Sequence, residues 1–529
     1  MKFKVLNLPA VFACLLLAGL LPAQAKVVNA LSCSLTDVKN AVASAALGDT
    51  VLLPAGTNGW TSLLTISGIT LQGAGVNSTV IMDETPVVPA GNGNPILQMN
   101  ARPDSMSRIT QIQFTHGVGN NITTFPNNYN AEILVYGSTN NWRIDHCYLN
   151  VLSGKSIRVG EDTFGLIDHN VFVTFDRIGV EVFGLGYGDA DWAAPTQFGS
   201  DKAVYIEDNT FQDGNNFGWV DVSNGGRAVF RHNTNNGYYF NTHGAETTQR
   251  YRSARYVEVY NNNFSYEIGH AYQNFYAMCD IRGGSGVIFS NIANGYWSTV
   301  SLNSYRTTDN DPGFLPWFGA TGLRLWDSNG PALLTGTASV TSNGLVVAGS
   351  TWTSNQWVGC TVYNINNTLC GVVVGNDATT MQFMGSRHSA FQIHFTAGDS
   401  FTVHKVYPCI DQPGRGQGAL LSGDNPNPVF LNDALEPVYI WGNQRSVNYN
   451  VATAQSGNGG TSYLNIQENR DFFNNIPRPG YTPFTYPHPL TLITGAVVNT
   501  NGVPPPPTNS IPPPVNTLLP PTDLNVRPL

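Results

Sequence analysis

The chain has 529 residues, of which only 12% are charged, and its formal net charge at pH 7 is −9. This acidic balance argues against a nucleic-acid partner, because binding to a phosphate backbone requires clustered lysine and arginine. The length exceeds that of most single cores, but a repeat fold grows by stacking and escapes this limit. Length and composition therefore exclude one class of partner without requiring several domains.

Residues 1–25 have the features of a secretory signal peptide. Two lysines precede an apolar run from 11 to 21, and an Ala-x-Ala cleavage pattern ends at Ala25. The apolar run is shorter than the roughly 20 apolar residues that a membrane span requires, and no later stretch approaches that length. We therefore expect a secreted or periplasmic protein with no membrane span. An alternative interpretation takes Cys14 as the end of a lipoprotein signal.

A short helix is predicted after the signal segment, over about 35–46. Ser34 and Asp37 form a capping-box-like start, and apolar residues follow at helical spacing. Short strands are predicted next, at 51–54 and 69–73, separated by glycine-containing turns. A helix leading into short, regularly spaced strands is typical of the N-terminal cap of a parallel β-helix, whose first coil would otherwise expose its core.

An internal repeat dominates the chain from 144 to 291. In each copy an apolar residue lies three positions before an asparagine, which is replaced once by cysteine, and copies follow one another at 23 to 39 residues. The repeated polar positions are Cys147, Asn170, Asn209, Asn233, Asn262 and Asn291. We expect these side chains to stack at one bend of successive coils and to satisfy backbone groups there, as scaffold rather than as catalysts.

The predicted fold is therefore all-β: a right-handed parallel β-helix with a short capping helix and a small inserted β-domain. Residues 26–330 form the β-helix, and 331–405, where the repeat stops, form the insert. Residues 406–500 resume the coils, and the proline-rich residues 501–529 form an extended tail. Export permits disulfides, and within the insert we expect Cys360 to pair with Cys370.

The motifs of this repeat resemble the pectate-lyase-like superfamily of β-helices, over about 35–330 and 416–490. Four of them follow the order found in the chondroitinase B and alginate lyase family. They are Asp145-His146-Cys147, Ile157-Arg158-Val159-Gly160, Asn170-Val171-Phe172 and Phe230-Arg231-His232. The resemblance implies an enzyme that cleaves acidic polysaccharides by elimination, with calcium as cofactor.

The chain departs from that family at the catalytic lysine. The family places a Lys-Ser pair after an acidic calcium-binding strand, whereas the corresponding stretch here is 180–184 and has no lysine. The family's arginine partner maps onto Arg231. His243-Gly244 is similar to a pair in polygalacturonase-type hydrolases, but the adjacent aspartate pair of those enzymes is missing.

One position of the repeat predicts a charged column. Asp145, Asp168, Glu207, Arg231 and Tyr260 alternate with inward apolar residues, so we expect them to point outward, about 4.8 Å apart from coil to coil. Stacked carboxylates require a cation, an arginine or raised pKa values, and oxygen ligands suit calcium. Asp168 and Glu207 are therefore the predicted calcium ligands. The alternative is that solvent and neighbouring arginines satisfy them.

The coil from 221 to 255 is rich in arginine, tyrosine and histidine and contains no lysine. Arginine binds carboxylate or sulfate groups in a fork geometry, and tyrosine stacks on sugar rings. The predicted substrate-binding residues are Asp221, Arg227, Glu246, Arg250 and Arg252. The predicted catalytic residues are Arg231, for charge stabilisation, and His243, as the base. In the alternative, these arginines only pair with neighbouring carboxylates.

Three functions remain open at this stage. The leading hypothesis is a monomeric polysaccharide lyase acting on an acidic polymer such as pectate, alginate or a glycosaminoglycan-like chain. A glycoside hydrolase on the same scaffold would need two carboxylates at a defined separation, which the charged column offers. A surface protein that binds glycans without cleaving them is the third.

Overall fold

The computed structural model describes residues 25–86, 95–117, 131–151, 155–174, 178–184, 194–212, 218–244, 253–266, 277–296, 298–302, 332–358, 360–383, 392–404, 412–416, 434–445, 449–453, 466 and 468–493. The predicted signal segment and the proline-rich tail lie outside these residues, as do the side chains of Cys370 and Cys409. Among the described residues, no helix is long and apolar enough to cross a membrane.

Three parallel sheets build a β-helix, and each coil contributes one strand to each sheet in the order A, B, C. Sheet A comprises β1 Val27–Asn29, β2 Thr50–Leu52, β5 Thr70–Gln72, β8 Ser107–Thr110, β11 Trp142–Asp145, β14 Leu166–Asp168, β17 Val204–Glu207, β20 Arg227–Arg231, β23 Tyr256–Tyr260, β26 Ser285–Phe289, β37 Val438–Trp441 and β40 Phe472–Asn474. Sheet B comprises β3 Gly56–Trp60, β6 Thr79–Asp83, β9 Gln113–His116, β12 Tyr148–Val151, β15 Val171–Thr174, β18 Thr210–Gln212, β21 Thr234–Asn236, β24 Asn263–Ser265, β27 Ile292–Asn294 and β38 Gln444–Arg445. Sheet C comprises β4 Leu64–Ile66, β7 Leu97–Asn100, β10 Ala131–Tyr136, β13 Lys155–Val159, β16 Ile178–Phe183, β19 Val220–Ser223, β22 Phe240–Thr242, β25 Ala277–Ile281, β28 Ser298–Leu302 and β39 Tyr449–Thr453. The predicted right-handed parallel β-helix is confirmed, with the hand that parallel crossovers adopt.

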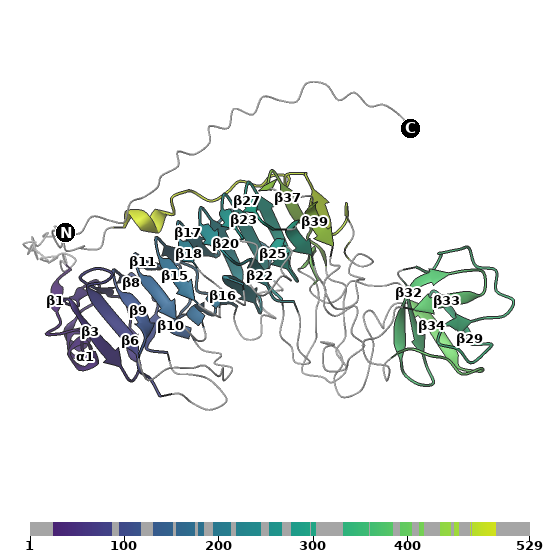
Figure 1. Cartoon of the computed structure of the whole chain (residues 1–529), viewed down its shortest axis with the longest axis horizontal. Coiled ribbons are helices and arrows are strands. Elements are labelled where there is room, and N and C mark those ends of the chain that lie inside the picture. The colour runs from purple at the N-terminus through teal and green to yellow at the C-terminus, as the bar shows by residue number, and fades with distance from the viewer. Residues whose placement is uncertain are drawn as a thin grey trace, which may run out of the picture. The chain divides into compact units, whose positions relative to one another are not determined.

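The N-terminal cap forms as its sequence predicts. Helix α1 spans Leu35–Ser44, and the Ser34 hydroxyl accepts a hydrogen bond from the backbone N–H of Asp37 at 3.2 Å. Val38 and Ala41 are buried against the first coils, so the helix covers the end of the core. Figure 1 shows α1 beside β1 and β3 at the purple end of the β-helix.

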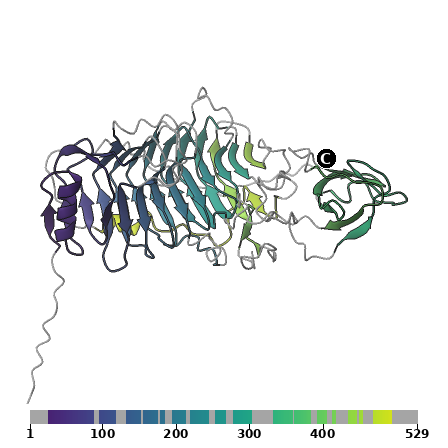
Figure 2. The ribbon, with the colours of Figure 1, turned by 90° about the horizontal axis from the view of Figure 1, so that it is seen from below.

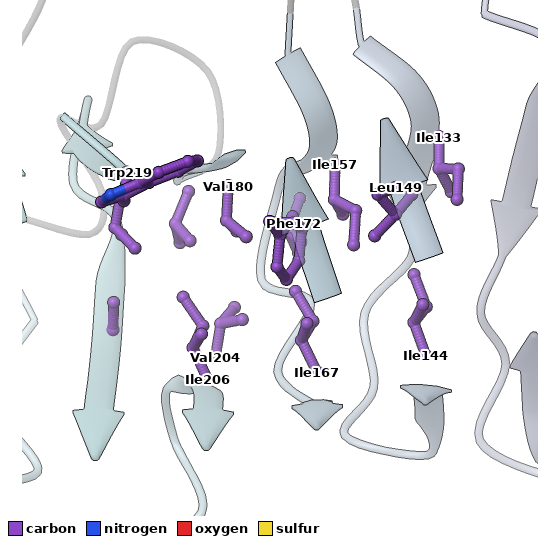
Figure 3. Packing of buried hydrophobic residues seen from close by; sticks show 14 of the residues in the cluster. Ile133, Ile144, Leu149, Ile157, Ile167, Phe172, Val180, Val204, Ile206 and Trp219 are labelled. Atoms are coloured by element: carbon purple, nitrogen blue, oxygen red, sulfur yellow. The ribbon is translucent and has the colours of Figure 1, made fainter. Parts of the chain in front are cut away.

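Inward aliphatic and aromatic side chains fill the interior in columns that run along the helix axis. Figure 3 shows Ile144, Ile167 and Ile206 from sheet A facing Ile157 and Val180 from sheet C. All five are fully buried in one continuous core. Every strand therefore has one inward face fixed by this core, and the alternation fixes which residues point outward.

The corner between sheets A and B carries the predicted asparagine ladder. Asn170 Nδ2 donates to Asn209 Oδ1 at 3.1 Å, and the same bond continues through Asn233, Asn262 and Asn291. A further bond at 2.9 Å extends the ladder to Asn443. Each amide also donates to a backbone carbonyl of the coil before it, as Asn170 does to Ile144 at 2.9 Å. The single-axis stack predicted for these residues is confirmed, and its role is structural.

Residues 334–404 contain a separate antiparallel sheet that shares no described strand with sheets A, B or C. It comprises β29 Leu334–Thr337, β34 Ser400–His404, β31 Thr361–Asn364, β32 Cys370–Asn376, β33 Thr380–Phe383 and β30 Leu345–Val346. Its own core includes Val362, Val373 and Phe401. A two-stranded sheet of β35 Arg415–Gly416 and β36 Ala434–Leu435 precedes the last coils.

The chain after β40 runs back along the outer face of sheet A, as the yellow ribbon in Figure 1 shows. We call residues 475–493 the strap; it ends in a 3-10 helix, η4 Pro489–Leu492. Arg231 donates to two backbone carbonyls of the strap, each at 2.8 Å. His488 donates its backbone N–H to Glu207 Oε1 at 2.8 Å. Figure 2 gives the view from below, with the successive coils side by side.

Candidate active site on the outer face of sheet C

Outward residues of sheet C form a polar column across five coils. Parallel pairing places them in register from β13 to β25, each one strand from the next. The column comprises Arg158, Glu181, Asp221, Asn241 and Asp280. Inward neighbours such as Val180 and Val220 are fully buried in the core, which fixes the opposite direction of the column. Acidic, basic and amide groups therefore stand about 4.8 Å apart on one face.

Two cations hold the first carboxylate of the column. Lys155 Nζ donates to Glu181 Oε1 at 2.7 Å, and Arg158 Nε lies 2.6 Å from Glu181 Oε2. Lys155 and Glu181 are buried, whereas Arg158 is half-buried and its guanidinium lies over the ring of Phe183, 4.4 Å from the centroid. Both oxygens of Glu181 are therefore engaged by cationic side chains.

The next carboxylate, Asp221, holds a histidine. His243 Nδ1 lies 2.6 Å from Asp221 Oδ1, and Asn241 Nδ2 donates to the same oxygen at 3.2 Å. Burial raises the pKa of Asp221, but His243 above all, with Arg282 and Lys155, outweighs burial and lowers it. Since the ionised carboxylate only accepts, His243 carries a proton on Nδ1, and the lone pair of the neutral ring lies on Nε2.

The histidine of this pair is open to solvent, unlike its partner. The side chain of His243 is 37% exposed, whereas that of Asp221 is 3% exposed. Arg282 is placed one strand further on, and its Nε donates to the carbonyl of Thr242 at 2.9 Å. An oriented base beside an arginine can bind a carboxylate-bearing substrate and remove a proton beside that carboxylate.

Arg231 is predicted to be an exposed catalytic residue, and the prediction of its exposure is wrong. It points outward from β20, but the strap covers it and its side chain is 0% exposed. Arg231 Nε donates to Glu207 Oε2 at 2.6 Å. It also belongs to sheet A, whereas His243 follows β22 of sheet C, so the two predicted catalytic residues occupy different faces.

The predicted calcium ligands do not fit a metal site. Asp168 is fully buried and receives both Nε and Nη2 of Arg143, at 2.7 and 2.6 Å. Glu207 is fully buried between Arg231 and the strap. This arrangement matches the alternative to calcium, in which neighbouring arginines pair with the carboxylates of the column. Within the described ranges, no group of three or more His, Cys, Asp or Glu is placed to hold a metal ion.

The predicted substrate-binding residues separate in the structure. Asp221 lies in the sheet C column, whereas Arg227 lies in sheet A, buried, with its guanidinium 5.6 Å from the ring centroid of Phe164. Glu246, Arg250 and Arg252 lie outside the described residues. Among its described residues, the arginine-rich coil supplies Asp221, Asn241 and His243 to the sheet C face.

The sequence alone did not single out Lys155, Arg158, Glu181, Asp280 or Arg282 as site residues. The signal that could have found them is the register of sheet C, in which Arg158, Glu181 and Asp221 are partners. That register was hidden because loops of different length separate the strands of successive coils. Only sheet A and its corner carry a recurring sequence motif.

Comparisons with known proteins find no matching family model and no matching curated protein. Among solved structures, an alginate lyase from Paenibacillus sp. strain FPU-7 aligns with a TM-score of 0.27 and 14% identity, over 53% of this chain and 81% of that chain. The PL6 family alginate lyase AlyGC aligns with a TM-score of 0.33 and 17% identity, over 53% of this chain and 40% of that chain. A mutant of AlyGC aligns with a TM-score of 0.34 and 16% identity, over 52% of this chain and 40% of that chain. The β-helix assignment itself rests on the three sheets of this chain.

Proposed function

We propose that this protein is a polysaccharide lyase that cleaves an acidic polysaccharide by β-elimination on the outer face of sheet C. The observation that supports the proposal is the Asp221–His243 pair, 2.6 Å apart, with Lys155 and Arg282 close enough to act on the same carboxylate. Export as a secreted or periplasmic enzyme, as residues 1–25 predict, is part of the proposal.

Elimination requires three operations, and the column has a group for each. Arg282, one strand beyond His243, neutralises the substrate carboxylate and so acidifies the neighbouring C–H bond. Nε2 of His243 takes that proton, and the electron pair forms a carbon–carbon double bond as the glycosidic C–O bond breaks. The departing oxygen takes a proton from the imidazolium of His243. Asp221 holds the ring in the required tautomer and stabilises its charged form.

This proposal contains no metal step, because two carboxylates of the column, Glu181 and Asp221, are engaged by basic side chains. Glu181 is bound by Lys155 and Arg158, and Asp221 by His243 and Asn241. Calcium, which the sequence motifs imply, stays a prediction that no described cluster of ligands supports. Activity that a chelator abolishes would contradict this part of the proposal.

The test is a panel of acidic and neutral polysaccharides incubated with purified protein. A lyase leaves a conjugated double bond at the new non-reducing end, which absorbs ultraviolet light, so absorbance should rise with acidic polymers alone. His243→Gln should slow the rise by about 10²–10³-fold, as loss of a general base does. His394→Gln, which changes an exposed histidine between β33 and β34, should leave the rise unchanged. New reducing ends without absorbance would select a hydrolase. Binding without any cleavage would select the glycan-binding protein.

A further inference from the structure

Two histidines at the A–B corner form an exposed pair that the proposed function does not use. His146 and His169 occupy the same bend of successive coils, and their side chains are 45% and 40% exposed. Both residues have left-handed backbone conformations, with φ of 52° and 53°. Their rings stack with centroids 5.1 Å apart and planes only 7° from parallel. The pair therefore presents two equivalent ring edges to solvent.

Buried carboxylates fix both rings. Asp145 Oδ2 lies 2.7 Å from His146 Nδ1, and Asp168 Oδ2 lies 2.7 Å from His169 Nδ1. A carboxylate accepts, so each Nδ1 carries a proton and each Nε2 faces away from the helix. The carboxylates cannot turn, because arginines hold both oxygens of each. Arg108 binds Asp145 with two bonds of 2.6 Å, and Arg143 binds Asp168 with bonds of 2.7 and 2.6 Å.

The parallel arrangement discriminates between ligands. A single metal ion needs two nitrogen lone pairs that converge at about 2.0–2.1 Å, whereas these two point the same way from rings 5.1 Å apart. Two parallel N–H donors can each give one hydrogen bond of about 2.7–3.2 Å to a group with two oxygens side by side, because a hydrogen bond tolerates the inward tilt that the ring spacing imposes. The described residues give neither Nε2 a hydrogen-bond partner. The geometry thus favours an oxyanion over a metal.

The charges around the pair permit an anion when the imidazoles are protonated. Arg108 and Arg143 balance Asp145 and Asp168, so two imidazolium groups add positive charge that these neighbours do not cancel. The pKa of His169 is raised, chiefly by the hydrogen bond that its ring donates to Asp168. One carboxylate opposes the anion: Asp208 follows His169 in the bend column. That carboxylate accepts the hydroxyl of Tyr486 at 2.9 Å and faces the strap.

We propose that His146 and His169 form a binding site for an oxyanion, such as a carboxylate, sulfate or phosphate group, bridged between their Nε2–H donors. The site lies at the A–B corner and is separate from the column on sheet C. Its affinity should fall as pH rises, because an Nε2 without its proton cannot donate a hydrogen bond to the oxyanion. A uronate or sulfate group of a polysaccharide and a free inorganic anion share this chemistry.

The experiment titrates inorganic sulfate into protein with isotopically labelled histidine, at constant ionic strength, and follows the imidazole resonances by NMR. The His146 and His169 resonances should shift saturably near pH 6, with at least tenfold weaker binding at pH 8. His146→Asn and His169→Asn should each weaken binding by at least tenfold. Asparagine is the matched substitution, because Asn261 occupies this bend position with φ of 56°.

Three outcomes decide the proposal. Saturable binding that acidic oligosaccharides displace supports an anchoring site for the polysaccharide. Saturable binding that they do not displace supports a site for free oxyanions. Shifts that do not saturate, or that survive in both variants and match those of His394, overturn the proposal. Lyase activity enters none of these measurements, so the proposed function and this site can fail independently.

Discussion

Two outer faces of the same β-helix carry charged columns, of which one is partly covered by the strap and the other keeps an exposed histidine. On sheet A, Arg108, Arg143 and Arg231 each pair with a carboxylate, and the strap buries the last of these pairs completely. On sheet C, Asp221 pairs with a histidine that stays 37% exposed. The difference teaches that alternation along a strand decides which way a side chain points. Exposure depends on whatever packs on that face later.

The largest effect on stability is expected from a substitution that breaks the Arg231–Glu207 pair of the sheet A column. Arg231→Met leaves Glu207 buried without its main cation, which costs about 3–5 kcal/mol of unfolding free energy. Denaturant unfolding followed by circular dichroism measures this loss. The paired replacement Arg231→Met with Glu207→Leu should recover most of it, because it removes the unpaired charge. A single variant as stable as the wild type would show that the pair is not needed for folding.

The second prediction concerns sheet C, where a substitution should lower activity and leave stability nearly unchanged. His243→Gln should lower turnover by about 10²–10³-fold, as loss of a general base does, with little change in stability. Asp221→Asn should lower turnover too, by disturbing the tautomer of His243. Initial rates on a cleaved polymer, with unfolding curves beside them, measure both. If His243→Gln unfolds the protein as Arg231→Met does, the two faces do not differ in the way proposed here.

The sequence alone predicts the features that depend on local residues, but not those that depend on docking between distant segments. The asparagine ladder and the capping helix were predictable, because both depend on local chemistry repeated at fixed spacing: an amide beside a bend, and Ser34 before α1. The strap was not predictable. His488 contacts Glu207 across 281 positions, and nothing in the composition of 475–493 indicates its place of docking. Arg231 was therefore assigned a catalytic role that its burial contradicts.

A third prediction tests the scaffold that both faces share. Asn233 accepts the backbone N–H of Asn209 and donates to the carbonyls of Ile206 and Arg231. Asn233→Ala leaves these buried groups without partners, at a cost of about 1–3 kcal/mol for a buried unsatisfied group. The unfolding free energy should fall by that amount while the kcat of the folded fraction stays constant. A change in kcat would mean that the ladder also positions the sheet C residues.

The smallest expected effect lies where the strap meets solvent. Tyr486 donates its hydroxyl to Asp208 Oδ1 at 2.9 Å, and its ring stacks on His232 with centroids 3.7 Å apart. Tyr486→Phe keeps the stack and removes the hydrogen bond. The loss of unfolding free energy should be about 0.5–1.5 kcal/mol, the net contribution of a typical hydrogen bond, and toward the low end because Tyr486 is exposed.

Tyr486→Ala removes the stack as well and should cost more. Hydrogen exchange of the strap amides measures both variants, and it should quicken in that order while amides of the sheet C strands stay protected. Equal exchange in the two variants would mean that the stack of Tyr486 on His232 contributes nothing to holding the strap.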